Sequence, residues 1–261
     1  MITEQLDFTG RVAIVTGGAT GIGYATALQL AKLGASLVIC SRTVDELEAA
    51  AMRIEAESGS RCLAVPTDVK NEESCIALVQ RTVEEFGKVD ILVNNAGGTR
   101  MGPLESIPTR GWDSIFDLNT KSTYILTREA GKHMIAQKSG AIVNISSGAG
   151  VNGVKGGAHY SAAKCAVQMF TKVTAAEWGR YGIRANCVAA GAIASARVSE
   201  AWKVAGLDEE QMGKAVPLGR TGTPDEMANM IVFFCSDAAS YISGETISVS
   251  GGPNIGGIDL Q

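Results

Sequence analysis

Short apolar runs alternate with longer helical segments along the whole chain, and this alternation limits the possible folds more than any other feature. The runs expected to be strands are rich in β-branched residues: 11–16, 36–41, 62–66, 91–94, 141–146, 183–188 and 246–250. Between them lie segments with helical spacing of apolar side chains: 21–33, 44–58, 72–86, 112–137, 158–181 and 224–236. Buried strands that are each followed by a crossover helix are typical of parallel sheets. We therefore predict an α/β fold, a Rossmann-type doubly wound parallel sheet of about seven strands with helices on both faces.

No linker, low-complexity tract or repeat interrupts this pattern, so we expect residues 1–261 to form a single dinucleotide-binding catalytic domain. Only the segment at about 196–216 departs from the rhythm of strands and helices, and we expect it to be a substrate lid. At 46% hydrophobic and 19% charged residues, the chain can bury a large core. Its net charge of −4 argues against a nucleic-acid partner, which needs clustered basic charge.

The compartment is expected to be the cytoplasm. The N-terminal residues carry charge and lack the apolar run of a signal peptide. Residues 12–31 are uncharged and long enough to span a bilayer, but their glycines and threonines make a lipid-facing helix a poor fit, so we expect no membrane partner. The six cysteines and two histidines are scattered without zinc-site spacing, which predicts buried reduced thiols and no metal.

In doubly wound sheets, ligands bind at the carboxyl ends of the strands, where the next helices begin. A glycine-rich turn, Thr16-Gly17-Gly18-Ala19-Thr20-Gly21-Ile22-Gly23, joins the first predicted strand to the first predicted helix. Glycines there let backbone N–H groups approach a pyrophosphate, and a helix N-terminus favours its negative charge. A P-loop is excluded because Tyr24 follows Gly23 in place of Lys-Ser/Thr. We expect a dinucleotide to bind at residues Gly17, Thr20, Gly21, Ile22 and Gly23.

The end of the second predicted strand indicates which dinucleotide binds. An acidic residue there holds the ribose 2′-hydroxyl of NAD, whereas an arginine accommodates the 2′-phosphate of NADP. The sequence reads Ser41-Arg42, with no acid before Asp45. NADP(H) is therefore favoured, and NAD(H) stays possible.

Ser147 follows the fifth predicted strand, and Tyr160 and Lys164 lie one helical turn apart on the next predicted helix. A phenol with a pKa near 10 is a poor acid–base catalyst at neutral pH. A nearby ammonium group stabilises the phenolate and lowers that pKa, and a serine hydroxyl can hydrogen-bond an oxygen on which charge develops. The three side chains therefore predict proton transfer beside a nicotinamide.

Over essentially its whole length, the chain resembles the short-chain dehydrogenase/reductase family. The resemblance is carried by motifs in family order at Thr16–Gly23, Asp68-Val69, Asn94-Asn95-Ala96-Gly97, Asn119, Ser147, Tyr160–Lys164 and Asn186–Ser195. It implies that Tyr160 is the general acid in reduction and the base in oxidation, and that Lys164 lowers its pKa and binds the nicotinamide ribose. It implies too that Ser147 orients the substrate oxygen, and that Asn119, at a break in its helix, holds a water in a proton relay to Lys164.

The resemblance also implies the rest of the cofactor site: Asp68 and Val69 at the adenine, Asn95, Ala96 and Gly97 along the ribose side, and Ile193 and Ser195 at the nicotinamide carboxamide. The family is commonly tetrameric, with helices 112–137 and 158–181 at an interface. One departure is visible, since Ala190-Gly191 stands where the family usually has Pro-Gly. That change puts the placement of the nicotinamide in question.

The sequence thus predicts an NADP(H)-preferring oxidoreductase that interconverts a carbonyl and a secondary alcohol. Apolar residues in the lid indicate a substrate of appreciable apolar size. Two alternatives stay open. One is a reductase of acyl-CoA thioesters (3-oxoacyl, enoyl or dienoyl), and the other is a non-catalytic dinucleotide-binding regulatory protein.

Overall fold

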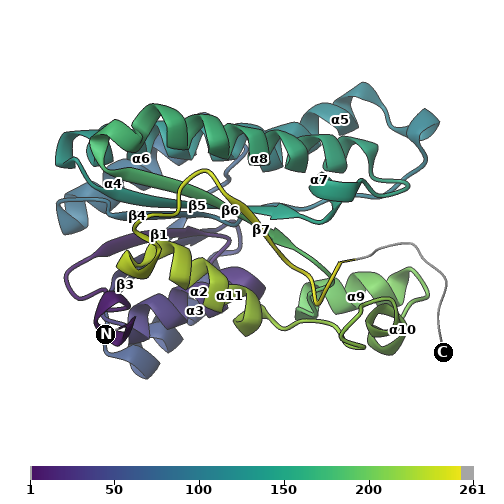
Figure 1. The fold of residues 1–261 in the computed structure, drawn as a ribbon, viewed down its shortest axis with the longest axis horizontal. Coiled ribbons are helices and arrows are strands. Elements are labelled where there is room, and N and C mark those ends of the chain that lie inside the picture. The colour runs from purple at the N-terminus through teal and green to yellow at the C-terminus, as the bar shows by residue number, and fades with distance from the viewer. Residues whose placement is uncertain (1, 254–261) are drawn as a thin grey trace.

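A computed structural model describes residues 2–253, and its centre is one parallel sheet in the order β3-β2-β1-β4-β5-β6-β7 (Figure 1). The predicted α/β fold is confirmed. Because the strand order reverses between β1 and β4, a crevice opens beside these two strands at their carboxyl ends. The strands are β1 (Val12–Thr16), β2 (Ser36–Ser41), β3 (Cys62–Pro66), β4 (Ile91–Asn94), β5 (Gly140–Ser147), β6 (Ile183–Ala190) and β7 (Thr246–Val249).

Two helical layers cover the sheet, and each has its own core. Alternate strand residues point to opposite faces, so Ala13 and Val15 belong to one core while Ile14 belongs to the other. One layer contains α2 (Gly21–Lys32), α3 (Val44–Ser58) and α11 (Pro224–Cys235); the other contains α4 (Glu72–Phe86), α6 (Ser122–Gln137) and α8 (Ala158–Trp178) (Figure 1). Strands that are buried on both faces explain the continuous apolar runs of the sequence.

Most predicted boundaries lie within two residues of those in the structure. β1 begins at Val12 instead of Arg11, and α2 ends at Lys32 because Gly34, at φ 98°, follows its last turn. β5 and β6 are longer than predicted because they pair with each other as far as Ser147 and Ala190.

The prediction of one helix over 112–137 is wrong. The segment begins as α5 (Thr109–Phe116), widens into the π-helical turn η2 (Asp117–Lys121) and continues as α6. At the π turn, Asn119 Nδ2 donates a hydrogen bond to the Ile115 carbonyl oxygen at 2.9 Å and another to the Gly98 carbonyl oxygen at 2.9 Å. A side chain that bonds both its own helix and a neighbouring loop explains why the helix is distorted at this point. The 158–181 prediction also needs correction, because α8 ends at Trp178 and a 3₁₀ turn follows.

The structure adds short helices that the periodicity did not predict. They are α1 (Ile2–Gln5), α7 (Ala149–Asn152), α9 (Ala196–Val204) and α10 (Glu209–Lys214). In the view of Figure 1, α7 lies above the right-hand end of the sheet, whereas α9 and α10 lie below it. The segment at about 196–216, which the sequence predicts to be a lid, contains two capped helices, with Ser195 and Asp208 accepting hydrogen bonds from the backbone N–H groups of Val198 and Gln211.

All six cysteines are free thiols, and only Cys165 is exposed, as the sequence predicted for most of them. Within residues 2–253, no helix is long and apolar enough to cross a membrane. The same residues contain no cluster of three or more His, Cys, Asp or Glu side chains that could hold a metal ion.

Candidate active site

The glycine turn between β1 and α2 is built for close backbone contact. Gly17 and Gly21 have positive φ angles of 64° and 56°. A Cβ atom on Gly23 would overlap the Gly17 carbonyl and lie 2.6 Å from Asn95 Nδ2. The side chain of Thr20, the N-cap residue of α2, accepts no hydrogen bond from the first N–H groups of the helix. The first N–H groups of a helix attract anions, and pyrophosphate binding at this turn stays a prediction.

The end of β4 is fastened to this turn. Asn95 Nδ2 donates a hydrogen bond to the Thr16 carbonyl oxygen at 2.8 Å. Thr16 Oγ1 accepts hydrogen bonds from the backbone N–H groups of Asn95 and Ala96 at 3.0 and 2.9 Å. Thr16 therefore fixes the path of residues 95–97 beside the crevice, a role that sequence reasoning missed although Thr16 is the last residue of the first strand.

The ends of β2 and β3 form the outer side of the crevice. Ser41 Oγ donates a hydrogen bond to the Thr43 carbonyl oxygen, and Arg42 is exposed with no ion pair among the residues described. The carboxylate of Asp68 accepts a hydrogen bond from the Lys70 backbone, and Asn71 caps α4. Asp68 is exposed, and its neighbour Val69 is buried in the core beneath α4.

Ser147, Tyr160 and Lys164 come together at the carboxyl end of β5. Ser147 is the last residue of that strand, and its hydroxyl is hydrogen-bonded to the phenol of Tyr160 in the first turn of α8. Lys164 is only 4% exposed, and its Nζ lies 5.8 Å from the centre of the Tyr160 ring. Nζ donates a hydrogen bond to the Ile145 carbonyl oxygen at 2.8 Å. The ammonium group has no carboxylate partner among residues 2–253.

Burial shifts the pKa values of Tyr160 and Lys164 in opposite directions. It raises the pKa of Tyr160, and the hydrogen bond to Ser147 acts in the opposite direction. It lowers the pKa of Lys164 to about 8, with the nearby thiol of Cys187 opposing the change. Desolvation of the phenolate is the largest influence on the pKa of Tyr160 in this structure, and the expectation that Lys164 lowers that pKa stays a prediction.

Asn119 lies close to the lysine. A Cβ atom on Gly97 would be 2.7 Å from Asn119 Oδ1 and 3.1 Å from Lys164 Nζ, so the three residues meet at one point. Thr120 Oγ1 donates a hydrogen bond to the Ala163 carbonyl oxygen at 3.0 Å, which ties the π turn to α8. The break in the helix falls at Asn119, where the family resemblance located it.

A polar chain that sequence reasoning missed supports the lysine from behind. Gln168 Nε2 donates a hydrogen bond to Ser146 Oγ at 2.9 Å, and Ser146 Oγ donates to the Lys164 carbonyl oxygen at 2.9 Å. Gln168 lies one helical turn after Lys164, and this i, i+4 spacing is a sequence feature that could have identified it. These hydrogen bonds hold α8 against the end of β5.

The segment after β6 reaches back over the glycine turn. Ile193 is buried, and Ser195 Cβ lies 3.3 Å from the position that a Cβ on Gly21 would occupy. Ala190 continues β6, and its carbonyl oxygen accepts a hydrogen bond from Gly148 at 2.8 Å. The alanine at the site of the family's proline therefore belongs to a regular strand that leads directly into this segment.

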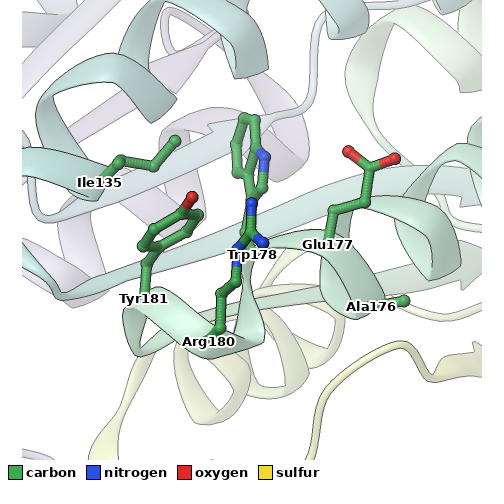
Figure 2. Close-up of a pocket in the computed structure, with 6 residues that line it drawn as sticks. All are labelled: Ile135, Ala176, Glu177, Trp178, Arg180 and Tyr181. Carbon is green, nitrogen blue, oxygen red and sulfur yellow. The ribbon is translucent and has the colours of Figure 1, made fainter.

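Two surface hollows lie elsewhere. One has a volume of about 280 Å³, and Figure 2 shows its lining residues at the ends of α6 and α8: Ile135, Ala176, Glu177, Trp178, Arg180 and Tyr181. The other, of about 470 Å³, lies beside the first residues of β5 and β6. Neither contains a residue predicted to bind cofactor or substrate. The site residues thus gather at the carboxyl ends of the strands, and these hollows lie at the amino ends.

Comparison with known proteins defines the class. The family model described as "Enoyl-(Acyl carrier protein) reductase" matches residues 17–254. The chain is 40% identical over 248 residues to a 3-oxoacyl-[acyl-carrier-protein] reductase of Synechocystis sp., covering 94% of this chain and 97% of that protein. It is 35% identical to an NAD-dependent glycerol dehydrogenase of Listeria innocua, covering 97% of each. The crystal structure of levodione reductase superimposes with a TM-score of 0.90 at 32% identity, covering 94% of this chain and 98% of that one.

These matches identify a dinucleotide-binding oxidoreductase. More specifically, the chain belongs to the short-chain dehydrogenase/reductase family, whose members bind a nicotinamide dinucleotide and act on an alcohol or a carbonyl.

Proposed function

We propose that the chain interconverts a carbonyl and a secondary alcohol, with NADP(H) preferred over NAD(H) and with Asn119, Ser147, Tyr160 and Lys164 as the catalytic residues. One observation carries this proposal: the hydroxyl groups of Ser147 and Tyr160 are hydrogen-bonded to each other beside the buried ammonium of Lys164, at the edge where the glycine turn opens. A substrate oxygen that contacts both hydroxyls would receive two hydrogen bonds there.

The cofactor would lie along this edge. The N-terminus of α2 at Gly17, Thr20, Gly21, Ile22 and Gly23 would hold the pyrophosphate. Ser41, Arg42, Asp68 and Val69 would bind the adenosine end, and Asn95, Ala96 and Gly97 the ribose side. Ile193 and Ser195 would bind the carboxamide, while Tyr160 and Lys164 bind the nicotinamide ribose. When bound, the nicotinamide supplies or accepts the hydride.

The protein residues position the substrate and move a proton. Ser147 would donate a hydrogen bond to the carbonyl oxygen. The phenol of Tyr160 is protonated at neutral pH and would donate its proton as the carbonyl is reduced, and the ammonium of Lys164 would offset the rise in pKa that burial causes. In the oxidation direction, the same oxygen accepts the proton of the alcohol. The ammonium of Lys164 stabilises the phenolate formed in reduction, and Asn119 would hold the water that returns a proton through Lys164.

Replacing Tyr160 with Phe tests the reaction. Because general acid catalysis contributes about 10²–10⁴-fold, we expect Tyr160→Phe to lower kcat by at least 100-fold in a carbonyl panel assayed with NADPH. The dissociation constant of NADPH, measured by fluorescence titration, should change by less than about threefold, since one hydroxyl contributes little to the whole contact. A variant with wild-type kcat would contradict the role given to Tyr160.

Replacing Arg42 tests the cofactor preference. The exposed, unpaired guanidinium favours a 2′-phosphate, which NADP carries and NAD lacks. We expect Arg42→Ala to raise the KM for NADPH about tenfold and to leave the KM for NADH nearly unchanged. Arg53→Ala is a matched control, because Arg53 stacks on Tyr24 on the neighbouring helix. Equal changes in both KM values would exclude the 2′-phosphate contact.

Exposed apolar side chains around the crevice support a substrate of appreciable apolar size. Met101 and Leu104 follow β4, Val151 and Val154 follow β5, and the lid adds Val204 and Leu207. An acyl-CoA thioester is a second candidate substrate; the matching 3-oxoacyl-[acyl-carrier-protein] reductase is named for an acyl group on a different carrier. Product analysis distinguishes ketone reduction from reduction of a conjugated C=C bond. Binding of NADPH without turnover of any carbonyl would identify a regulatory protein instead.

The same proposal includes a cytoplasmic homotetramer formed by one domain per chain. Exposed apolar side chains on α5, α6 and α8 support an interface there: Trp112, Tyr124, Met169 and Val173. Light scattering of the Met169→Glu variant would test it. A wild-type protein that is monomeric at micromolar concentration would exclude the tetramer.

A further inference from the structure

Two segments at the carboxyl ends of β4 and β5 are bonded to each other and to the helix of Tyr160. The Gly102 N–H donates a hydrogen bond to the Gly156 carbonyl oxygen at 2.8 Å. The Val154 N–H donates one to Ser161 Oγ at 3.1 Å. Ser161 is the residue after Tyr160, so both segments are held within one helical turn of the proposed general acid.

An apolar wall lies on this pair of segments. A Cβ atom on Gly157 would lie 2.7 Å from Val154 Cγ1 and 3.3 Å from Met101 Sδ, so both side chains cover the same glycine. Met101 and Val154 are nevertheless 51% and 43% exposed. Gly157 precedes Tyr160 by three residues. A substrate with its carbonyl at Tyr160 could therefore place an apolar body against this wall.

Next to the wall stand two cations without partners. Arg100 precedes Met101 and Lys155 follows Val154, and both are exposed. Neither forms an ion pair with any residue that the structure describes, including Glu105 of the same loop. On the lid, Lys203 and Lys214 face Glu200 and Glu210 at 4.0 and 2.8 Å, whereas Arg197 forms no ion pair with a described residue. Arg100 and Lys155 differ from Arg197 in lying directly beside the exposed apolar side chains of Met101 and Val154.

A backbone hydrogen bond joins the two segments that carry Arg100 and Lys155. Arg100 is two residues from Gly102, and Lys155 is next to Gly156, so the bond between those glycines joins their segments. Two cations on adjacent segments repel each other, and an anion between them relieves that repulsion. Arginine and lysine both bind carboxylates and phosphates through charge-assisted hydrogen bonds.

We propose that Arg100 and Lys155 bind an anionic group, a carboxylate or a phosphate, at the end of the substrate remote from its carbonyl. The inference rests on the proposed function and adds a substrate class: a carbonyl compound with an apolar body and an anionic tail. Tyr160 and Ser147 act on the carbonyl, Met101 and Val154 contact the apolar body, and the two cations bind the tail.

Matched substrate pairs test this assignment and distinguish the two anions. One pair is 4-oxocyclohexanecarboxylate and its methyl ester; the other is acetoacetyl-CoA and the acetoacetyl thioester of N-acetylcysteamine, which lacks the phosphates. At low salt we expect kcat/KM of the wild type to favour the anionic member of one pair about tenfold. The Arg100→Gln/Lys155→Gln double variant should bring that ratio to about one. Lys138→Asn, which removes an exposed cation before β5 and suits its left-handed backbone, should keep the ratio.

Equal efficiencies within both pairs, or a preference that survives in the double variant, would overturn the inference and leave the proposed function standing. Preference in the first pair alone assigns a carboxylate, and preference in the second alone assigns the phosphates. If the wild type turns over none of the four compounds, the proposed function loses support. The inference is then decided by calorimetry with cyclohexanecarboxylate and cyclohexanecarboxamide, where only the carboxylate should bind more weakly to the double variant.

Discussion

Positively charged side chains have different partners at the two ends of the strands. We call the end where the strands begin the amino edge of the sheet, and the end where they finish the carboxyl edge. At the amino edge, Arg11 forms two hydrogen bonds with the Asp237 carboxylate at 2.8 and 2.7 Å. Arg184 donates hydrogen bonds to the carbonyl oxygens of Phe234 and Ser236 at the end of α11, at 2.7 and 2.9 Å. At the carboxyl edge, the Lys164 ammonium has one carbonyl partner and Arg42 has no ion pair among the residues described.

This difference separates structural charges from charges available to a ligand. A buried hydrogen-bond donor that is paired within the protein stabilises the fold. A buried donor without a partner lowers the stability of the fold unless a ligand accepts its hydrogen bond. The two hollows at the amino edge, one of which is drawn in Figure 2, are therefore weaker candidates for function than the carboxyl edge. Three substitutions test the contrast.

The largest effect is expected at the glycine turn. A Cβ atom on Gly23 would overlap the Gly17 carbonyl, so Gly23→Ala must displace the start of α2. We expect NADPH to bind at least about 100-fold more weakly, because the backbone N–H groups lose their alignment. The control at the amino edge is Gly179→Ala, where a Cβ meets nothing within 4 Å and the φ angle of −54° suits alanine. Calorimetric titration measures both, and unchanged affinity in Gly23→Ala would refute the pyrophosphate assignment.

The second effect concerns the buried charge of Lys164, whose pKa burial lowers to about 8. Between that value and about 10.4, the ordinary pKa of lysine, the unfolded chain binds more protons than the folded one. Stability therefore rises with pH across this window, and the charge destabilises the fold below pH 8. We expect Lys164→Met to raise the free energy of unfolding at pH 7 by up to about 3 kcal/mol while abolishing turnover.

Denaturant unfolding from pH 7 to pH 10.5 checks this sign. The gain from Lys164→Met should shrink as the pH rises, because the wild-type lysine loses its charge. Lys172→Met, on the exposed side of the same helix, should give no such trend. A Lys164→Met protein less stable than the wild type at pH 7 would show that the hydrogen bond to Ile145 outweighs the cost of burying the charge.

The smallest effect is expected at Arg184, whose pKa burial also lowers. Arg184→Leu removes hydrogen bonds from the carbonyl groups that end α11, and we expect it to lower the free energy of unfolding by about 2 kcal/mol. Arg11→Leu breaks a largely exposed pair and should cost less than about 1 kcal/mol. Neither variant should alter the KM for NADPH. A changed KM would show that the amino edge contributes to the site.

The sheet and its helices were largely predictable because the residues that the sequence pattern marks as apolar are the ones that the fold buries. Segments 36–41, 62–66, 91–94, 44–58 and 72–86 have the predicted bounds, since apolar periodicity and capping residues specify both ends. β5 and β6 exceed their predicted lengths because small residues at their ends are held in the sheet by each other. The lid helices α9 and α10 are too short for periodicity to distinguish them from loops.

The location of the candidate site was also predictable, but its electrostatics were not. A sequence shows that Tyr160 and Lys164 share a helix face, but not how deeply either is buried. Burial raises the pKa of Tyr160, which the spacing of Tyr160 and Lys164 in the sequence does not indicate. His159 shows the same limit. Its sequence position indicates a place in the first turn of a helix but not its burial, and the side chain is 3% exposed with Nδ1 lacking a hydrogen-bond partner among the described residues.

The packing of α11 against α2 has a consequence for how the protein is made. The two helices lie on the same face of the sheet (Figure 1), although about 200 residues separate them. During synthesis from the N-terminus, the side of α2 that packs against α11 stays uncovered until residues 224–235 have left the ribosome, whereas its contacts with β1, β2 and α3 can form earlier. The helix that would receive the pyrophosphate is therefore among the first parts synthesised and among the last to be fully packed. Chaperones and proteases would meet that exposed surface in any chain that stops before α11.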